Sequence, residues 1–170
     1  MISTKGRSLT TSRIHPPDLG QRGEGWVVLQ VVLLVATVGT GFIGPLGSGP
    51  ARTVGAIAGV ALAILGIGLV TAGILRLRRQ LTAFPRPVPG GRLIDDGVFG
   101  LVRHPMYGGA VIAALGWGLA MASPMALAGA LVLGGFFDLK SRREEAWLGD
   151  LFAGYAAYRR RTRRLIPWLY

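Results

Sequence analysis

The stretch Arg103-His104-Pro105-Met106-Tyr107-Gly108-Gly109 decides how this chain is organised, because it stands where a basic, Pro/Gly-rich segment gives way to an apolar run. Proline is favoured at the first position of a helix, where its fixed φ fits and its missing N–H leaves no donor unpaired. The same proline disfavours a helical conformation of the residue before it. The pattern therefore predicts a helix that begins at Pro105, with His104 at its cap.

The start of this expected helix suits an anionic group. Helix amino termini carry free N–H groups and a partial positive charge, which attract carboxylates and phosphates. His104 and Tyr107 are three positions apart and share one face, while Gly108 and Gly109 leave room against the backbone. A simpler interpretation is that the two rings only anchor a membrane helix at the level of the lipid headgroups.

The composition points to a single domain of a membrane protein. Of the 170 residues, 51% are hydrophobic, and the mean hydropathy is +0.47. The absence of cysteine excludes disulfides, thiolate catalysis and cysteine-ligated metals, and with only two histidines we expect no metal site. The formal net charge of +11 fits either a nucleic acid or an anionic membrane surface as partner.

The first part of the chain predicts a flexible basic tail followed by a membrane hairpin. The tail covers residues 1–25, and the hairpin, residues 26–75, consists of the uncharged runs 26–43 and 53–75. Both runs have about the length that spans a bilayer. We interpret the first as a retained span and not as a secretory signal, because the apolar part of a signal is usually shorter.

The second of these runs is rich in glycine. Gly55 and Gly59 form a GxxxG pair, and further glycines follow. Small residues at this spacing let membrane helices approach closely. We therefore expect this run to pack tightly within a helical hairpin.

Residues 76–170 carry the remaining features. A connector rich in arginine, proline and glycine cannot continue the preceding helix. Beyond it, residues 105–142 predict a second membrane hairpin that turns at Ser123-Pro124. Since its two arms have equal length, the second arm ends at the level where the first begins. The motif at 103–109 is thus expected to meet a second polar cluster, which consists of Lys140, Arg142, Arg143, Glu144 and Glu145.

The C-terminal part predicts an amphipathic helix on the membrane surface. Leucine and aromatic side chains recur at helical spacing from Leu148 to Tyr158, and a run of arginines follows. Such a helix holds its arginines against anionic lipid. Nucleic-acid binding is the alternative explanation for the arginines, but the ending Leu165-Ile166-Pro167-Trp168-Leu169-Tyr170 is typical of an interfacial anchor, so we expect no nucleic-acid partner.

The distribution of lysine and arginine predicts the orientation. Basic residues concentrate in the N-terminal tail, the connector and residues 138–170, and are absent from the turn at 123–124. By the positive-inside rule, both termini and the connector lie in the cytoplasm. The sequence therefore predicts an all-α membrane protein with four transmembrane helices in two hairpins, a cytoplasmic connector and a C-terminal interfacial helix. We expect a multi-pass protein of a bacterial inner (plasma) membrane.

The expected site combines an anion-accepting helix start, aromatic rings and carboxylates. Glu144 and Glu145 project about 100° apart, so at most one points squarely into a site, and both could simply form surface ion pairs. A ligand that uses the whole set is zwitterionic, with an aromatic system for Phe99 or Tyr107. S-adenosylmethionine has these groups, and its sulfonium suits aromatic faces. The residues alone leave a nucleotide or an amino-acid-like ligand open.

Two blocks of the sequence resemble known signatures. The first is Leu93-Ile94-x-x-Gly97-x-Phe99-x-x-x-Arg103-His104-Pro105-Met106-Tyr107-x-Gly109. The second is Arg143-Glu144-Glu145-x-x-Leu148, followed by Phe152, Tyr155, Tyr158 and Arg164-x-x-Pro167. In order and spacing, the two blocks resemble the superfamily of isoprenylcysteine carboxyl methyltransferases and phospholipid methyltransferases over residues 76–170. The two N-terminal runs carry no motif of that superfamily.

The resemblance implies an integral membrane methyltransferase that binds S-adenosylmethionine from the cytosol and takes a lipophilic acceptor from the bilayer. The acceptor would be an isoprenylcysteine carboxylate or another isoprenoid or lipid head. By position, the residues implied to line the cofactor pocket are Leu93, Ile94, Phe99, His104, Pro105, Tyr107 and Glu144.

The implied catalytic candidates are Arg103, Lys140 and Glu145. Lys140 stands where relatives can carry an arginine that holds the acceptor, although a lysine cannot grip a carboxylate with two parallel hydrogen bonds. A carboxylate acceptor needs no base, whereas an amine or a hydroxyl needs one, and Glu145 is the nearest candidate. Phe99 stands where the superfamily often has tyrosine, so a hydroxyl contact is lost.

Other functions are kept as alternatives. Phospholipid N-methylation is the alternative within the same class of enzyme. Sterol-type reductases share related membrane folds, but no feature of this sequence selects a nicotinamide cofactor. A non-catalytic binding or scaffold module is the alternative from a different class, and the retention of His104, Tyr107 and Glu144 favours the enzyme over it.

Overall fold

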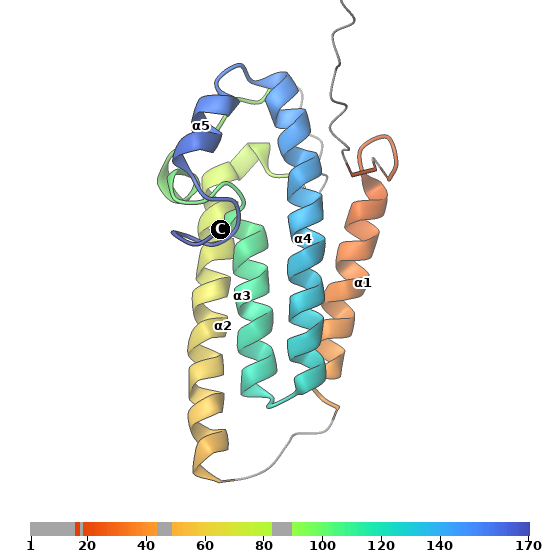
Figure 1. The fold of residues 1–170 in the computed structure, drawn as a ribbon, viewed down its shortest axis with the longest axis vertical. Coiled ribbons are helices and arrows are strands. Elements are labelled where there is room, and N and C mark those ends of the chain that lie inside the picture. The colour runs from red at the N-terminus through yellow and green to blue at the C-terminus, as the bar shows by residue number, and fades with distance from the viewer. Residues whose placement is uncertain (1–15, 18, 44–48, 83–89) are drawn as a thin grey trace, which may run out of the picture.

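The computed structural model describes residues 16–17, 19–43, 49–82 and 90–170 (Figure 1). Within them it contains five α-helices, two short 3-10 helices and no strand. The elements are α1 (Glu24–Thr40), α2 (Pro50–Leu77), η1 (Arg78–Gln80), η2 (Gly97–Gly100), α3 (Pro105–Ala120), α4 (Pro124–Leu151) and α5 (Tyr155–Arg161). Most of the predicted tail and the proline-rich part of the connector lie outside the described residues.

The helix starts follow local sequence rules. Proline occupies the first turn of α2, α3 and α4, where its missing N–H costs nothing. α3 begins at Pro105 with His104 as its cap, which confirms the predicted helix start. At the start of α4, the side chain of Ser123 accepts a hydrogen bond from the backbone N–H of Ala126 at 3.2 Å, which satisfies one free donor of that helix.

The four long helices lie side by side in the order α2, α3, α4, α1 (Figure 1). α2 packs along α3, α3 along α4, and α1 along α4. The second predicted hairpin, α3 with α4, is therefore present. The first is not, because α1 and α2 lie at opposite sides of the layer and pack against different partners.

Glycines explain why α2 packs on α3. A Cβ at Gly59 would lie 2.6 Å from the carbonyl oxygen of Gly116, and a Cβ at Gly66 would lie 2.5 Å from that of Gly109. Only glycine permits backbones to approach so closely. At Gly55 no atom lies within 4 Å of the same position. The predicted GxxxG pair is thus not the packing motif, and the glycines seven residues apart take its place.

One described helix, α2, is long and apolar enough to cross a membrane. α1 and α3 are apolar but shorter, and α4 is apolar only in its first part. The prediction of four membrane-spanning helices is therefore only partly supported. Large apolar side chains stay exposed along the bundle, such as Val35 at 67% and Ile64 at 65%. Soluble monomers rarely expose apolar surface so extensively.

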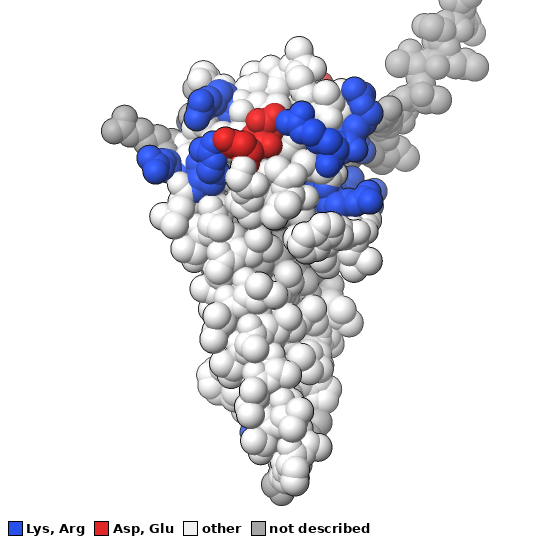
Figure 2. Space-filling view, turned by 90° about the vertical axis from the view of Figure 1, so that its left-hand side faces the viewer, with Lys and Arg blue, Asp and Glu red and all other residues white. Residues whose placement is uncertain are grey.

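Charged side chains gather at one end of the molecule. On the face shown in Figure 2, lysine, arginine and acidic residues form a band across the wide end, and the narrow end is nearly free of charge. α5 and the residues that follow it fold back over this charged end beside α2 and α3 (Figure 1). The bundle therefore has one polar end, and the motif at 103–109 lies there.

The C-terminal helix differs from the prediction. α4 continues to Leu151, and α5 covers only Tyr155–Arg161. Tyr155 and Tyr158, which were expected to face the membrane, are each only 3% exposed. The hydroxyl of Tyr158 donates to the carbonyl oxygen of Phe99 at 2.8 Å. These rings pack inward because the chain reverses after α4 and brings them over η2.

Candidate functional site

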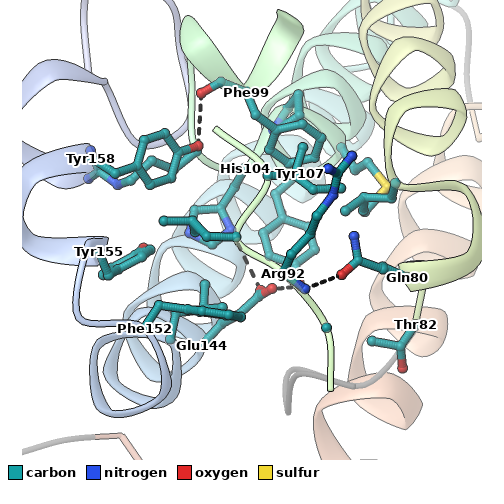
Figure 3. A pocket seen from close by; sticks show the side chains of 18 residues that line it. Gln80, Thr82, Arg92, Phe99, His104, Tyr107, Glu144, Phe152, Tyr155 and Tyr158 are labelled. Atoms are coloured by element: carbon teal, nitrogen blue, oxygen red, sulfur yellow. Dashed lines mark hydrogen bonds and ion pairs between the residues drawn. The ribbon is translucent and has the colours of Figure 1, made fainter. Parts of the chain in front are cut away.

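A pocket lies at the charged end of the bundle, between the end of α2, the segment that leads into α3, and the polar part of α4 (Figure 3). Its lining includes every residue that the sequence assigns to the cofactor, namely Leu93, Ile94, Phe99, His104, Pro105, Tyr107 and Glu144. The fold thus gathers residues from both sequence blocks into one cavity. The expected meeting of the two polar clusters takes place here.

Glu144 is the member of the acidic pair that faces the pocket. The hydroxyl of Tyr107 donates to its Oε2 at 3.0 Å, and Nδ1 of His104 lies 3.5 Å from the same oxygen. The Glu144 side chain remains 25% exposed, so it can accept further donors. One carboxylate is thus held by two rings of the motif and still open to a ligand.

A stack of three rings fixes the position of Tyr107. The His104 and Tyr107 rings are 5.4 Å apart and nearly parallel, with an interplanar angle of 5°. On α4, Phe137 stacks on Tyr107 at 4.7 Å and 13°. Stacked aromatic pairs at these distances contribute packing energy beyond their buried area. The hydroxyl of Tyr107 is therefore aimed at Glu144 by a rigid support.

Glu145 belongs to a buried polar cluster, which we name the clasp and which consists of Arg103, Glu145, Thr162 and Arg164. Oε1 of Glu145 accepts a hydrogen bond from Nε of Arg103 at 2.7 Å and lies 3.4 Å from Nε of Arg164. Arg103 also donates to the carbonyl oxygen of Thr162. Nε2 of His104 approaches the same Glu145 oxygen at 3.4 Å.

The ionic partners keep Glu145 charged. Burial alone would raise the pKa of this carboxyl group, but hydrogen bonds and positive charge from His104 and Arg103 outweigh burial and hold the pKa at about 2. The Glu145 side chain is only 4% exposed. A buried carboxylate with this many donors is a poor proton acceptor near neutral pH.

Backbone contacts complete the attachment of the C-terminal segment to the motif. The N–H of Arg103 donates to the carbonyl oxygen of Arg163 at 2.8 Å, and that of His104 to Arg164 at 3.0 Å. A Cβ at Gly108 would collide with the carbonyl oxygen of Leu165. The glycine of the motif is therefore needed for the C-terminal segment to lie against α3.

The three predicted catalytic residues occupy different places. Arg103 contributes to the pocket lining but is engaged in the clasp. Glu145 does not line the pocket. Lys140 does not either, since it is only 1% exposed, donates to Oε1 of Gln30 on α1, and has its Nζ 5.2 Å from the centre of the Tyr107 ring.

Several lining residues were not predicted to belong to the site. Phe152, Tyr155 and Tyr158 were part of the second block but were assigned to the membrane surface. Gln80 and Arg92 come from the connector, where the side-chain amide oxygen of Gln80 accepts from the backbone N–H of Arg92 at 2.6 Å. The block spacing could have indicated the aromatic residues, whereas nothing in the connector marked the other two. The remaining unpredicted lining residues are Leu77, Thr82, Gly91, Met106 and Leu148.

Tyr155 is distinctive among these residues. Its hydroxyl is buried and has no hydrogen-bond partner within the described part of the chain. Burial raises the pKa of both Tyr155 and Tyr158, so both hydroxyls stay protonated. A buried hydroxyl without a partner is costly. The pocket wall thus carries one donor that a ligand could satisfy.

No group of three or more potential metal ligands occurs among the described residues. An all-helical bundle with exposed apolar flanks and a pocket at its charged end has the architecture expected of a membrane-associated protein. Residues 54–154 match the phospholipid methyltransferase family, and the chain belongs to this family. No curated protein matches the chain.

Family membership implies methyltransferase activity and association with a membrane. The predicted superfamily is thereby confirmed. The matched region begins within α2, so that helix belongs to the family's common part although no motif in it was recognised. The same region contains both sides of the pocket, from the connector to Glu144.

Proposed function

We propose that this chain transfers a methyl group from S-adenosylmethionine to the polar head of a lipophilic acceptor at the cytoplasmic face of a membrane. The observation that carries the proposal is that all seven residues assigned to the cofactor line the same pocket. Family membership supports the reaction type. The residues that line the pocket support S-adenosylmethionine as the cofactor.

The lining fits the groups of this cofactor. Glu144 offers a carboxylate with free acceptor capacity to an ammonium or to ribose hydroxyls. Phe99 offers an aromatic ring to the adenine ring or to a sulfonium. The unpartnered hydroxyl of Tyr155 offers one more donor. Leu93 and Ile94 supply the apolar wall that a ring system needs.

When bound, S-adenosylmethionine supplies an electrophilic methyl group. The chain's own residues would act by position and by exclusion of water. Tyr107 and His104 hold Glu144 in place, and the clasp holds His104 in place. Arg103 supports this arrangement through Glu145 and not through contact with the acceptor. Because Glu145 is ion-paired, we do not assign it the role of general base.

For the acceptor, we propose a carboxylate such as that of an isoprenylcysteine, with a phospholipid amine as the second candidate. Lys140 points to neither, because it is engaged with Gln30 outside the pocket lining. Arg92 is a cation on the pocket wall and could attract a carboxylate. The family description favours the phospholipid as acceptor.

The proposed setting is a bilayer crossed by α1, α2, α3 and the apolar first part of α4, with the charged end, the connector and both termini on the cytoplasmic side. The band of charge at one end and the apolar remainder of the bundle support this orientation. It places the pocket where a cytosolic cofactor and a membrane-borne acceptor can both reach it. We place the protein in a bacterial inner (plasma) membrane.

The test is calorimetric titration of the detergent-solubilised full chain with S-adenosylhomocysteine, the demethylated product, with NADPH as a parallel ligand. We expect micromolar binding of the first and none of the second. Glu144→Gln should weaken the binding roughly 10- to 100-fold, as expected for a lost hydrogen bond to a charged group.

Asp150→Asn is the matched control, because it makes the same change on an exposed residue of the same helix. It should bind like the unmodified protein. Absence of binding in protein that melts cooperatively would overturn the methyltransferase and favour the scaffold. Transfer of a radiolabelled methyl group to an isoprenylcysteine analogue or to phosphatidylethanolamine then distinguishes the two acceptors.

A further inference from the structure

A second cavity lies at the C-terminal segment and shares no lining residue with the first. It is lined by Gly100, Leu101, Arg160, Arg161, Thr162, Arg163, Pro167 and Trp168. Three of these residues are arginines and none is acidic. The cavity is therefore a concentration of positive charge built from η2, α5 and the segment that follows.

Two of the three arginines are not neutralised. Arg161 forms an ion pair with Asp95 and lies over the ring of Tyr158 at 5.6 Å. Arg160 and Arg163 are exposed, and neither side chain has an ion-pair or hydrogen-bond partner in the part of the chain that the structure describes. A pair of free guanidinium groups at one cavity fits the oxygen atoms of a phosphate.

An apolar pair of side chains stands beside this basic cavity. Trp168 is 83% exposed and Leu169 is 77% exposed. Both sit in an ordered turn, because the N–H groups of Leu165 and Ile166 donate to the carbonyl oxygen of Tyr170 at 2.8 and 2.9 Å. The fold thus holds an indole and a leucine out toward the surroundings instead of burying them.

The position of the turn relates these features to a bilayer. The C-terminal segment runs from α5 back toward the apolar part of the bundle (Figure 1) and contacts the first turn of α3 at Gly108. The turn that carries the apolar pair therefore lies beside the start of α3. Tryptophan is favoured at the boundary between headgroups and acyl chains, and arginines at the headgroup level attract anionic lipid.

We propose that this cavity binds the phosphate headgroup of an anionic phospholipid, with Arg160 and Arg163 as its ligands and Trp168 with Leu169 inserted among the acyl chains. The site is distinct from the methyl-transfer pocket and does not depend on the proposed reaction. A single-stranded nucleic acid would also offer phosphates, but it has no use for the exposed leucine beside the cavity, and lipid is the occupant that uses both parts.

The experiment is native mass spectrometry of the delipidated full chain in detergent, titrated with phosphatidylglycerol or phosphatidylcholine. We expect the first phosphatidylglycerol to bind more tightly than phosphatidylcholine. In the double variant Arg160→Gln/Arg163→Gln, its affinity should fall roughly 30-fold, since each arginine near an anionic headgroup contributes about a factor of five. Binding of phosphatidylcholine should change little.

Arg22→Gln/Arg78→Gln is the charge-matched control, because both residues are exposed and line neither cavity. It should keep the preference for phosphatidylglycerol. An equal loss in the control, or no loss in the double variant, would overturn the site. Competition by inorganic phosphate or a short RNA at concentrations as low as those of the lipid would overturn the lipid assignment. Melting temperature and S-adenosylhomocysteine binding report separately on folding and on the first pocket.

Discussion

Glu144 and Glu145 are adjacent in the sequence but belong to two different regions, the pocket wall and the clasp. Glu144 accepts a hydrogen bond from Tyr107 and remains partly open. Glu145 is enclosed by Arg103, Arg164 and His104. The same chemical group is thus available to a ligand in one region and fully used by the protein in the other.

The surroundings of each carboxylate, and not its position in the sequence, therefore determine whether it is available to a ligand. On one turn of α4, the side chain that points toward the connector becomes part of a binding surface. Its neighbour points toward the C-terminal segment and joins that segment to the motif. A substitution in the clasp should therefore act first on stability, and a substitution in the pocket wall should act first on ligand affinity.

The largest loss of stability is expected for Glu145→Ala. Removing this carboxylate leaves the buried guanidinium of Arg103 without its main partner, which typically costs about 3–5 kcal/mol. We expect a large fall in the melting temperature in detergent. Glu144→Ala should cost about 1 kcal/mol, the value of one hydrogen bond at a partly exposed group. Equal losses in the two variants would show that the two regions are not distinct.

The stability of the protein at acid pH tests the charge of Glu145. The pKa of Glu145 is about 2 in the folded protein, below the value of 4.5 for a free glutamate. A lowered pKa stabilises the fold above the unfolded value, and this stabilisation is lost as the pH falls toward 2. It amounts to roughly 3 kcal/mol. Thermal melting between pH 5 and pH 2 should show this decrease.

Glu145→Gln isolates this contribution, because the variant lacks only this carboxyl group. The variant should be less stable than the unmodified protein at pH 5, and its stability should depend less on acid. Parallel curves for the two proteins between pH 5 and pH 2 would contradict a charged Glu145 in the clasp.

Much of the site could be predicted because the determinants are local. Pro105 fixes the start of α3, and equal helical arms bring Glu144 back to Tyr107. Only the resemblance assigned Glu144, and not Glu145, to the pocket, because the residues alone leave this choice open. It depends on the rotation of α4 about its axis, which the aromatic stack and the C-terminal segment determine together.

The helix pairing was harder to predict for the same reason. A glycine pattern indicates a close approach but does not name the partner, and Gly59 and Gly66 find their match in α3 and not in α1. Similarly, Tyr155 and Tyr158 have the spacing of an interfacial helix. Their burial follows from the reversal after α4, which no local signal marks.

Tyr107→Phe tests how much the hydrogen bond to Glu144 contributes to the pocket wall. It keeps the ring that stacks on His104 and Phe137 but removes the hydroxyl that donates to Glu144. One lost hydrogen bond is worth about 0.5–1.5 kcal/mol. We expect S-adenosylhomocysteine to bind roughly 2- to 10-fold more weakly, with a loss of stability no larger than that of Glu144→Ala. A loss as large as that of Glu144→Gln would mean that the hydroxyl itself contacts the ligand.

Tyr155→Phe is the smallest change and the most discriminating one. In the free protein, the Tyr155 hydroxyl is buried without a partner, so its removal should leave the melting temperature unchanged or raise it slightly. If a ligand completes the site, the same removal should weaken S-adenosylhomocysteine binding several-fold, as expected for one neutral hydrogen bond. Tyr158→Phe is the control, because its hydroxyl already donates to Phe99, and that variant should lose stability before affinity. Unchanged affinity in Tyr155→Phe would exclude this hydroxyl from the ligand's contacts and leave its burial to be explained by packing alone.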